Sequence, residues 1–258
     1  MRPPPPLSWL RDLSGAWIFY SVLPAWPGIE PRFTRIARFA PWIGAVLGGL
    51  QALLWLGLES RVPVLAQVAL TLALALWLSG GLHMDGAMDT ADGLAAGDRL
   101  LEAMDDSRVG AAGAQTLALL LLLRAAALAC LGAVAPVALV WAAVWGRVAP
   151  LLAMARFPYL RPGGTAAFHR QHWAGLAVEL RPTLLAVAAL GVPTLALISS
   201  PALALALLAG ALPALLVPHR LGRRLGGHSG DSYGACVEWS ECGALLLTAL
   251  AVTLGRAG

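Results

Sequence analysis

Acidic side chains recur at helical spacing between residues 80 and 110, in the segment GGLHMDGAMDTADGLAAGDRLLEAMDDSRVG. Residues in the first half follow the spacing i, i+4, i+7, and those after a glycine-containing break follow i, i+4, i+8, so each set shares one face of a helix. Two such helix ends can fold antiparallel and point their carboxylates at one another. The repulsion between like charges needs a cation, and all-oxygen ligands favour Mg²⁺ or Mn²⁺ over zinc. We therefore expect a magnesium site with the ligands Asp85, Asp89, Asp92, Asp98, Glu102 and Asp106.

An acidic loop that simply faces solvent is the alternative. Apolar residues such as Leu82, Met88, Leu100 and Met104 lie between the acids, so an apolar face runs beside the acidic one. That arrangement favours a site packed against other elements, and hence the metal.

Two other polar residues flank the acids. His83 precedes Asp85 by two positions. It is either a structural histidine at a helix end or a functional one, which binds a phosphate or acts as a base. Arg108 follows Asp106 by two positions and either faces a metal-bridged phosphate or anchors the chain at the membrane surface. We take these four residues as the candidate catalytic set.

Two arginines lie inside apolar stretches, where an unpaired charge costs at least about 2.5–3.5 kcal/mol. Arg124 and Arg147 must therefore meet a carboxylate, a polar cavity or an anionic ligand, unless their side chains extend to the membrane surface. Because Arg147 lies near the end of its stretch, it can reach the acidic segment, and we expect it to bind substrate.

A glycine-rich segment, LGGHSGDSYGA, occupies residues 225–235. Glycines beside an aspartate let backbone N–H groups approach a phosphate closely, although a plain turn would have the same composition. Three arginines just upstream favour an anion-binding loop. The candidate substrate-binding residues here are Gly227, Gly230, Asp231 and Glu238.

The composition indicates that a lipid bilayer surrounds these residues. Of the 258 residues, 59% are hydrophobic and 12% are charged, about half the charged share of a soluble domain. This excludes an ordinary soluble enzyme, a disordered chain and a small disulfide-rich scaffold. Apolar stretches of spanning length predict an all-α, polytopic integral membrane protein with about seven transmembrane helices, at residues 40–58, 62–82, 109–131, 135–155, two within 182–218 divided at Ser199-Ser200-Pro201, and a short one at 242–255. We expect one membrane-embedded catalytic domain over residues 1–258.

The arginines predict the orientation. With the N-terminus in the cytoplasm, 14 of the 18 arginines fall in inner segments and only Arg61 and Arg256 in outer ones. Residues 1–38 then form a cytoplasmic and interfacial segment, and residues 83–108 form an acidic catalytic segment on the same side. Because the arginines record topology, we expect membrane lipid and no nucleic acid as partner.

Three motifs together resemble one family. The strings GGLHMDGAMDTADG, DRLLEAMDDSRVGAAG and GGHSGDSYGACVE are similar to those of cobalamin synthase, the adenosylcobinamide-GDP ribazoletransferase family. The strings FYSVLP and PWIG near the N-terminus also resemble that family, so the likeness runs from about Phe19 to Glu241. Asp105 departs from it, because a basic residue is common there.

The resemblance implies a reaction. A ribose hydroxyl of α-ribazole or its 5′-phosphate attacks the cobinamide-side phosphorus of adenosylcobinamide-GDP; GMP leaves, adenosylcobalamin or its phosphate forms, and Mg²⁺ is required. It further implies a multi-pass protein of the cell (inner) membrane whose active site faces the cytoplasm. A homo-oligomer, or an association with other cobalamin-assembly enzymes, is left open.

Two other functions remain as alternatives. The string DTADG at residues 89–93 resembles the opening of the CDP-alcohol phosphotransferase motif, which would make the chain another Mg-dependent nucleotide-diphosphate-alcohol phosphotransferase, but the following residues depart from that pattern. Acids and arginines in membrane helices also mark cation or proton-coupled transporters. Against this, the acids here gather at one membrane face, whereas transporter sites lie near the midplane.

Overall fold

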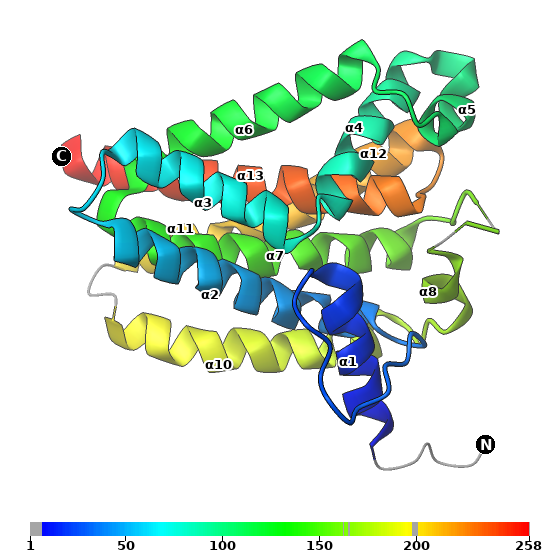
Figure 1. The fold of residues 1–258 in the computed structure, drawn as a ribbon, viewed down its shortest axis with the longest axis horizontal. Coiled ribbons are helices and arrows are strands. Elements are labelled where there is room, and N and C mark those ends of the chain that lie inside the picture. The colour runs from blue at the N-terminus through cyan, green and yellow to red at the C-terminus, as the bar shows by residue number, and fades with distance from the viewer. Residues whose placement is uncertain (1–6, 162, 165, 198–200, 258) are drawn as a thin grey trace.

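The computed structural model describes residues 7–161, 163–164, 166–197 and 201–257. These residues form helices joined by short connections, and their only β pairing is an isolated parallel bridge between Tyr159 and His228. The long helices run roughly along the long axis of the molecule (Figure 1). The predicted all-α architecture is confirmed.

The helices follow in this order: α1 (Ser8–Tyr20), η1 (Ala37–Phe39), α2 (Ala40–Leu58), α3 (Val64–Leu78), α4 (Leu82–Ala95), η2 (Gly97–Arg99), α5 (Leu100–Asp105), α6 (Ala111–Leu131), η3 (Gly132–Val134), α7 (Ala135–Arg156), α8 (Ala167–Gln171), α9 (Leu176–Glu179), α10 (Arg181–Leu197), α11 (Pro201–Ala209), α12 (Ala211–Leu225) and α13 (Gly230–Ala257).

The apolar helices identify a polytopic membrane protein. Five helical segments of the described chain are long and apolar enough to cross a bilayer, or six if the bent pair α3–α4 counts as one span. One of the five, Ala111–Arg156, contains both α6 and α7, which run in opposite directions (Figure 1). The number seven and the position of the N-terminus stay predictions. Of the expected break at 199–201, residues 199 and 200 lie outside the described residues.

The chain turns sharply at the end of the second predicted span, residues 62–82. The chain bends by 89° between α3 and α4, so the acidic segment leaves the direction of α3. Gly80 and Gly81 both have positive φ, at 61° and 72°, which is the left-handed conformation that glycine adopts without steric cost. The Gly81 N–H donates to the Leu76 carbonyl at 3.0 Å and closes the end of α3.

The second half of the glycine-rich segment and the predicted short last span form one long helix, which corrects the predicted bounds of that span. Helix α13 begins at Gly230 and runs for 28 residues. A reciprocal pair of hydrogen bonds stabilises its start: the Ser232 N–H donates to the Ser229 hydroxyl at 3.3 Å, and the Ser229 N–H donates to the Ser232 hydroxyl at 2.8 Å. This is the arrangement of a capping box, with serine in the place of the usual glutamate.

Small residues let the helices approach closely. Helix α2 crosses α7 at Gly44 and Gly48, where an added Cβ would overlap the α7 backbone. Helix α13 crosses α4 in the same way, since a Cβ on Gly86 would lie 2.5 Å from the Asp231 carbonyl and one on Gly234 would lie 2.9 Å from the carbonyl of the facing helix. Close crossings at small residues are typical of helices packed in lipid.

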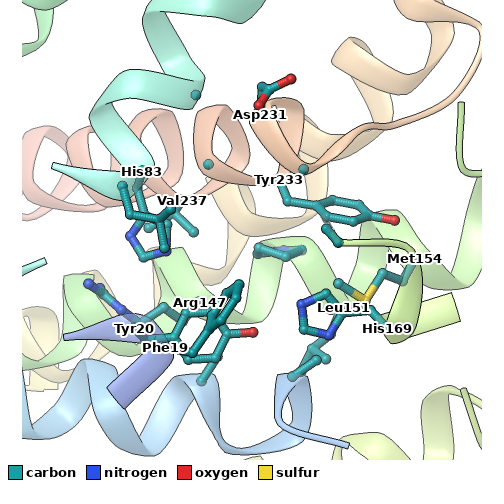
Figure 2. Close-up of a pocket in the computed structure, with 18 of the residues that line it drawn as sticks. Phe19, Tyr20, His83, Arg147, Leu151, Met154, His169, Asp231, Tyr233 and Val237 are labelled. Atoms are coloured by element: carbon teal, nitrogen blue, oxygen red, sulfur yellow. The ribbon is translucent and has the colours of Figure 1, made fainter. Parts of the chain in front are cut away.

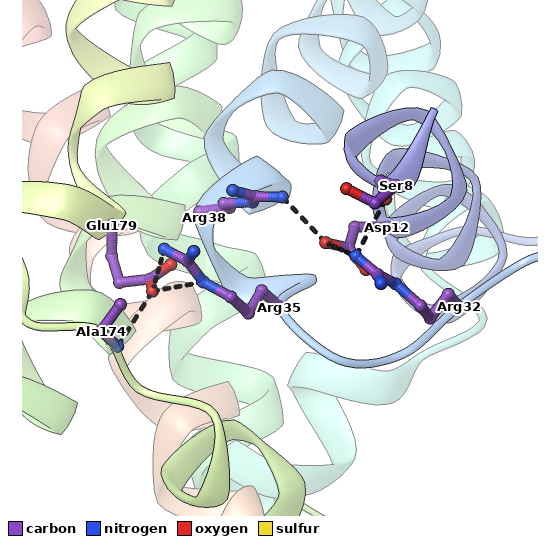
Figure 3. A network of polar contacts seen from close by, with 7 residues as sticks. All are labelled: Ser8, Asp12, Arg32, Arg35, Arg38, Ala174 and Glu179. Carbon is purple, nitrogen blue, oxygen red and sulfur yellow. Dashed lines mark hydrogen bonds and ion pairs between the residues drawn. The ribbon is translucent and has the colours of Figure 1, made fainter. Parts of the chain in front are cut away.

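Ion pairs fix the N-terminal segment to the bundle (Figure 3). The fully buried Asp12 of α1 accepts hydrogen bonds from Arg32 at 2.6 and 2.9 Å and from Arg38 at 2.8 Å. Arg35 donates to Glu179 of α9 at 2.6 Å. The end of α1 is therefore held against the entry to α2, at the end of the bundle where α13 begins.

Candidate active site

A cavity of about 120 Å³ lies among α1, α2, α4, α7 and α13, together with the segment that follows α7 (Figure 2). A buried water molecule needs about 10–15 Å³ of such volume, so the cavity has room for several water molecules or for a polar group of similar size. The cavity lies where α2 and α13 begin and α7 ends, and it is open at one side. It is lined by, among others, Phe19, Tyr20, His83, Asp85, Arg147, Met154, His169, Gly230, Asp231 and Tyr233.

Five of the predicted site residues line this cavity. They are separated by up to 148 positions in sequence and come from three helices: His83 and Asp85 from α4, Arg147 from α7, and Gly230 and Asp231 from α13. No other predicted residue lines it. The bend before α4 and the close crossing at Gly86 bring these residues together, because they place the start of α4 directly over the start of α13.

Carboxylates gather at the mouth of the cavity. Asp85 is exposed, and Asp89 and Asp231 are half-buried. The negative charges of Asp85, Asp231 and Asp92 all act on the Asp89 carboxylate, and Arg161 is the cation that acts on it. This mouth therefore carries more negative than positive charge.

Arg161 is a mouth residue that the sequence analysis did not single out. Its guanidinium contacts Asp231 at 3.1 Å and Asp105 at 2.9 Å, and it donates to the Leu101 carbonyl at 3.1 Å. The β-bridge positions it, since the Leu160 N–H donates to the carbonyl of His228 at 2.7 Å. In the sequence it reads only as one of several arginines that follow a membrane helix, so a tertiary contact was needed to find it.

Close packing explains one of the predicted glycines. Gly227 is buried outside the cavity lining, and a Cβ at this position would lie 2.7 Å from the Pro158 carbonyl. The residue lets the connection before α13 pass against the segment that carries Arg161. The prediction that Gly227 binds substrate stays a prediction.

A balanced charge network lies deeper in the bundle. Arg124 of α6 contacts the carboxylate of Glu238 at 2.8 Å and that of Glu241 at 3.4 Å, and Glu241 also forms an ion pair with Arg147. All four side chains are at most 14% exposed. Both arginines thus meet carboxylates, as the cost of an unpaired charge in a membrane requires. Glu238, predicted to bind substrate, belongs to this network and does not line the cavity.

Asp92 has a partner within the fold. The Gly110 and Gly113 N–H groups both donate to its carboxylate, each at 2.8 Å. These are N–H groups of the first turn of α6, which have no partner inside the helix, and a negative charge there is favourable. The side chain therefore joins α4 to α6.

The second acidic set does not face the first. Helix α5 has only six residues, and both Asp98 and Glu102 are exposed to solvent. Asp106 forms an ion pair at 2.6 Å with Arg108, which is 88% exposed; hydrogen bonds from Arg108 lower the pKa of Asp106 to about 2. Within the described residues, no three His, Cys, Asp or Glu side chains are placed to hold a metal ion together.

The carboxylates at the mouth nevertheless fit a magnesium ion that is shared with a ligand. Mg²⁺ is commonly held by one or two carboxylates together with substrate phosphates. Asp85 and Asp231 both line the cavity and offer only oxygen ligands, with Arg161 as the nearby cation. The donor set thus fits a shared ion better than a cage of six acids.

Aromatic side chains form the other wall. The rings of Tyr20 and His83 lie 6.1 Å apart, and the Nδ1 atom of His83 is buried without a hydrogen-bond partner in the described structure. Burial lowers the pKa of His169 to about 3, so this ring is neutral at physiological pH. The wall therefore combines apolar surface with an imidazole that has a free ring nitrogen.

Comparisons with known proteins agree with one another. A family model described as cobalamin-5-phosphate synthase matches residues 12–249. Two relatives from Prochlorococcus marinus, strains MIT 9303 and MIT 9313, are named adenosylcobinamide-GDP ribazoletransferase; each is 59% identical over 255 residues, covering 96% of this chain and 98% of the relative. A relative of the same name from Thermosynechococcus vestitus is 45% identical over 94% of this chain and 96% of its own length. Among solved structures, none matches the chain.

Proposed function

Because the chain belongs to the cobalamin-5-phosphate synthase family, we propose that its cavity joins adenosylcobinamide-GDP to α-ribazole. The chain is a membrane-embedded transferase of cobalamin biosynthesis. A ribose hydroxyl of α-ribazole, or of its 5′-phosphate, forms a bond to the cobinamide-side phosphorus. The bond from that phosphorus to the bridging oxygen breaks, GMP leaves with this oxygen, and the hydroxyl proton passes to a base.

The observation that carries this assignment to the cavity is the convergence of His83, Asp85, Arg147 and Asp231. Phosphoryl transfer depends on positioning and on neutralising charge more than on covalent chemistry. A cavity that combines a guanidinium, two carboxylates and an imidazole offers these functions within reach of one diphosphate.

We assign Asp85 and Asp231 to a magnesium ion that the diphosphate of the substrate would complete. When bound, the ion would neutralise the negative charge that develops on the departing GMP. Asp89, half-buried beside them, adds negative charge to the same place. Arg161 holds Asp231 and thereby fixes one of the two carboxylates.

Arg147 binds the diphosphate from the wall opposite the carboxylates. Its Nη1 atom donates to the Ala143 carbonyl at 3.1 Å and pairs with Glu241, whereas its Nε atom is buried without a partner in the described structure. His83 accepts the proton of the attacking hydroxyl, since its Nδ1 atom is without a partner beside the cavity.

The cavity opens toward the cytoplasm in this proposal, in a multi-pass protein of the cell inner membrane. It lies at the end of the bundle that carries Arg108, Arg161 and Arg170, whereas Arg61 lies at the opposite end, after α2. Labelling of single cysteines with an impermeant maleimide tests this orientation. Ser60→Cys should react from outside intact cells and Ser107→Cys only after lysis; the reverse pattern would contradict the proposal.

Transfer by the wild-type chain in lipid nanodiscs tests the proposed reaction. We expect GMP release from adenosylcobinamide-GDP to require both α-ribazole and Mg²⁺, with one cobalamin product formed per GMP. GMP release without α-ribazole would show hydrolysis instead of transfer. Full turnover in excess chelator would remove the metal from the proposal while leaving the transfer itself intact.

A further inference from the structure

A second hollow lies farther along α4 than the active-site cavity and shares no lining residue with it. It has a volume of about 390 Å³ and is bounded by α4 and α6 on one side and α12 on the other, with Trp239 of α13 between them. Helix α12 packs against α7 and α13, whereas α4 and α6 pack against each other and against α13. The hollow, which we call the α4–α12 groove, therefore lies between α4 and α6 on one side and α12 on the other, with α13 packed against all three helices.

The walls of the groove are mostly apolar. Ala87, Ala91 and Leu94 line it from α4, and Val217 and Leu221 line it from α12. Helix α12 lies within a segment apolar enough to span a bilayer, so the groove adjoins a candidate membrane span. An apolar gap of this kind in a membrane helix bundle suits a hydrocarbon chain.

Two guanidinium groups lie at the groove without partners. Arg220 and Arg224 are spaced i, i+4 on α12, both are exposed, and neither forms an ion pair or hydrogen bond with a described side chain. This contrasts with Arg124, Arg147 and Arg161, each of which meets carboxylates. The charge of the groove is thus positive and uncompensated.

A buried hydroxyl supplies a second, independent observation. Thr90 lines the groove and is 2% exposed, and its Oγ1 atom has no hydrogen-bond partner in the described structure. A buried polar atom without a partner is costly, so its presence beside the groove points to a polar group that enters from outside the chain.

We infer that the α4–α12 groove binds an anionic glycerophospholipid, with its phosphate at Arg220 and Arg224 and an acyl chain along the apolar walls. A water-soluble phosphate would explain the guanidiniums but leave the apolar surface without an occupant. The reacting diphosphate is not the occupant, because the close crossing of α4 and α13 at Gly86 and Gly234 separates the groove from the active-site cavity.

The test measures retention of lipid by the whole protein, independently of turnover. Wild-type protein in detergent is titrated with phosphatidylglycerol or phosphatidylcholine, and bound lipid is counted by native mass spectrometry. We expect phosphatidylglycerol to bind more tightly, and the double variant Arg220→Gln/Arg224→Gln to lose about thirtyfold in that affinity, as expected for two guanidiniums near an anionic headgroup. Arg223→Gln is the matched control, because Arg223 is exposed on the same turn but does not line the groove.

Four outcomes would overturn the inference. Equal binding of the two lipids would show an apolar crevice only, and equal losses in the control and the double variant would show diffuse surface charge. Displacement of the lipid by millimolar inorganic phosphate alone would show a free-phosphate site. The variant Val217→Phe fills the groove while keeping both arginines, so unchanged lipid binding in this variant would place the lipid elsewhere.

Discussion

Two groups of charged side chains in this helical bundle differ in their balance. The interior network pairs Arg124 and Arg147 with Glu238 and Glu241, and all four are buried. The mouth of the active-site cavity sets Asp85, Asp89 and Asp231 against Arg161, with more exposure to solvent. The charges of the interior network balance one another within the chain, whereas the mouth carries an excess of negative charge that a cation from outside would balance. Balanced buried charges mainly hold the fold, and an unbalanced group is the better candidate for a ligand site; Arg147 belongs to the network and also lines the cavity.

The largest effect should come from neutralising the mouth. We expect Asp85→Asn to reduce transfer by on the order of 10³-fold, because the variant removes one of the two carboxylates that we propose hold the metal for the diphosphate. The melting temperature should stay the same or rise, since like charges at the mouth repel. GMP release in nanodiscs measures the first effect.

Asp98→Asn makes the same chemical change at an exposed position outside the cavity. It should retain activity within about twofold, as substitutions away from the site do. Equal losses of activity in Asp85→Asn and Asp98→Asn would contradict a specific role for the carboxylates at the mouth.

Breaking the interior network should mainly reduce stability. Arg124→Gln leaves Glu238 as a buried charge without its partner, which costs about 3–5 kcal/mol in the free energy of unfolding. The double variant Arg124→Met/Glu238→Met removes both charges and should recover most of that loss. Reversible unfolding in mixed micelles measures both. An undiminished stability of the single variant would contradict a structural role for the network.

A smaller loss of stability is expected at Asp92, which joins α4 to α6. Asp92→Ala should cost about 1–2 kcal/mol in stability, the usual cost of losing a helix cap, because two N–H groups of α6 lose their acceptor. Asp92→Asn keeps one acceptor oxygen and should lose less. If Asp92→Asn lost transfer as severely as Asp85→Asn while remaining stable, Asp92 would belong with the metal ligands.

The smallest effect is expected at the exposed pair. The pKa of Asp106 is lowered to about 2 by Arg108, so the pair is complete above pH 4 and breaks only as the pH falls through about 2. Asp106→Asn should therefore leave transfer within about twofold and leave the pH profile between 5 and 8 unchanged. A tenfold loss, or a shifted profile, would return Asp106 to the active site.

The helices of the bundle could be predicted well because lipid leaves the backbone few choices. A stretch of about 20 apolar residues must satisfy its own hydrogen bonds, so the predicted stretch 40–58 forms α2 at the same bounds. The start of α13 was missed because its capping box uses Ser232 where glutamate is the usual signal. The bend before α4 was missed because it depends on the positive φ of Gly80 and Gly81, and two glycines in a sequence do not by themselves reveal their backbone conformation.

The site could be predicted in part. Asp85 lies in the acidic segment and Asp231 in the glycine-rich segment, both of which the sequence marks as candidate sites, and the fold brings them to one cavity. Local spacing could not show that Asp92 caps α6, because its partners follow 18 and 21 residues later. Nor could it show that Arg161 meets Asp231, a contact across 70 positions. Spacing along one helix defines a face, and only the packing of other helices decides what that face meets.

Binding of adenosylcobinamide-GDP in the absence of α-ribazole tests the central claim most directly, since no reaction then follows. For the wild-type chain, Mg²⁺ should strengthen binding at least about tenfold over excess chelator, because the ion joins the mouth to the diphosphate. The double variant Asp85→Asn/Asp231→Asn should bind equally with and without Mg²⁺. Wild-type binding that does not depend on Mg²⁺, or a double variant that keeps the full dependence, would contradict the account.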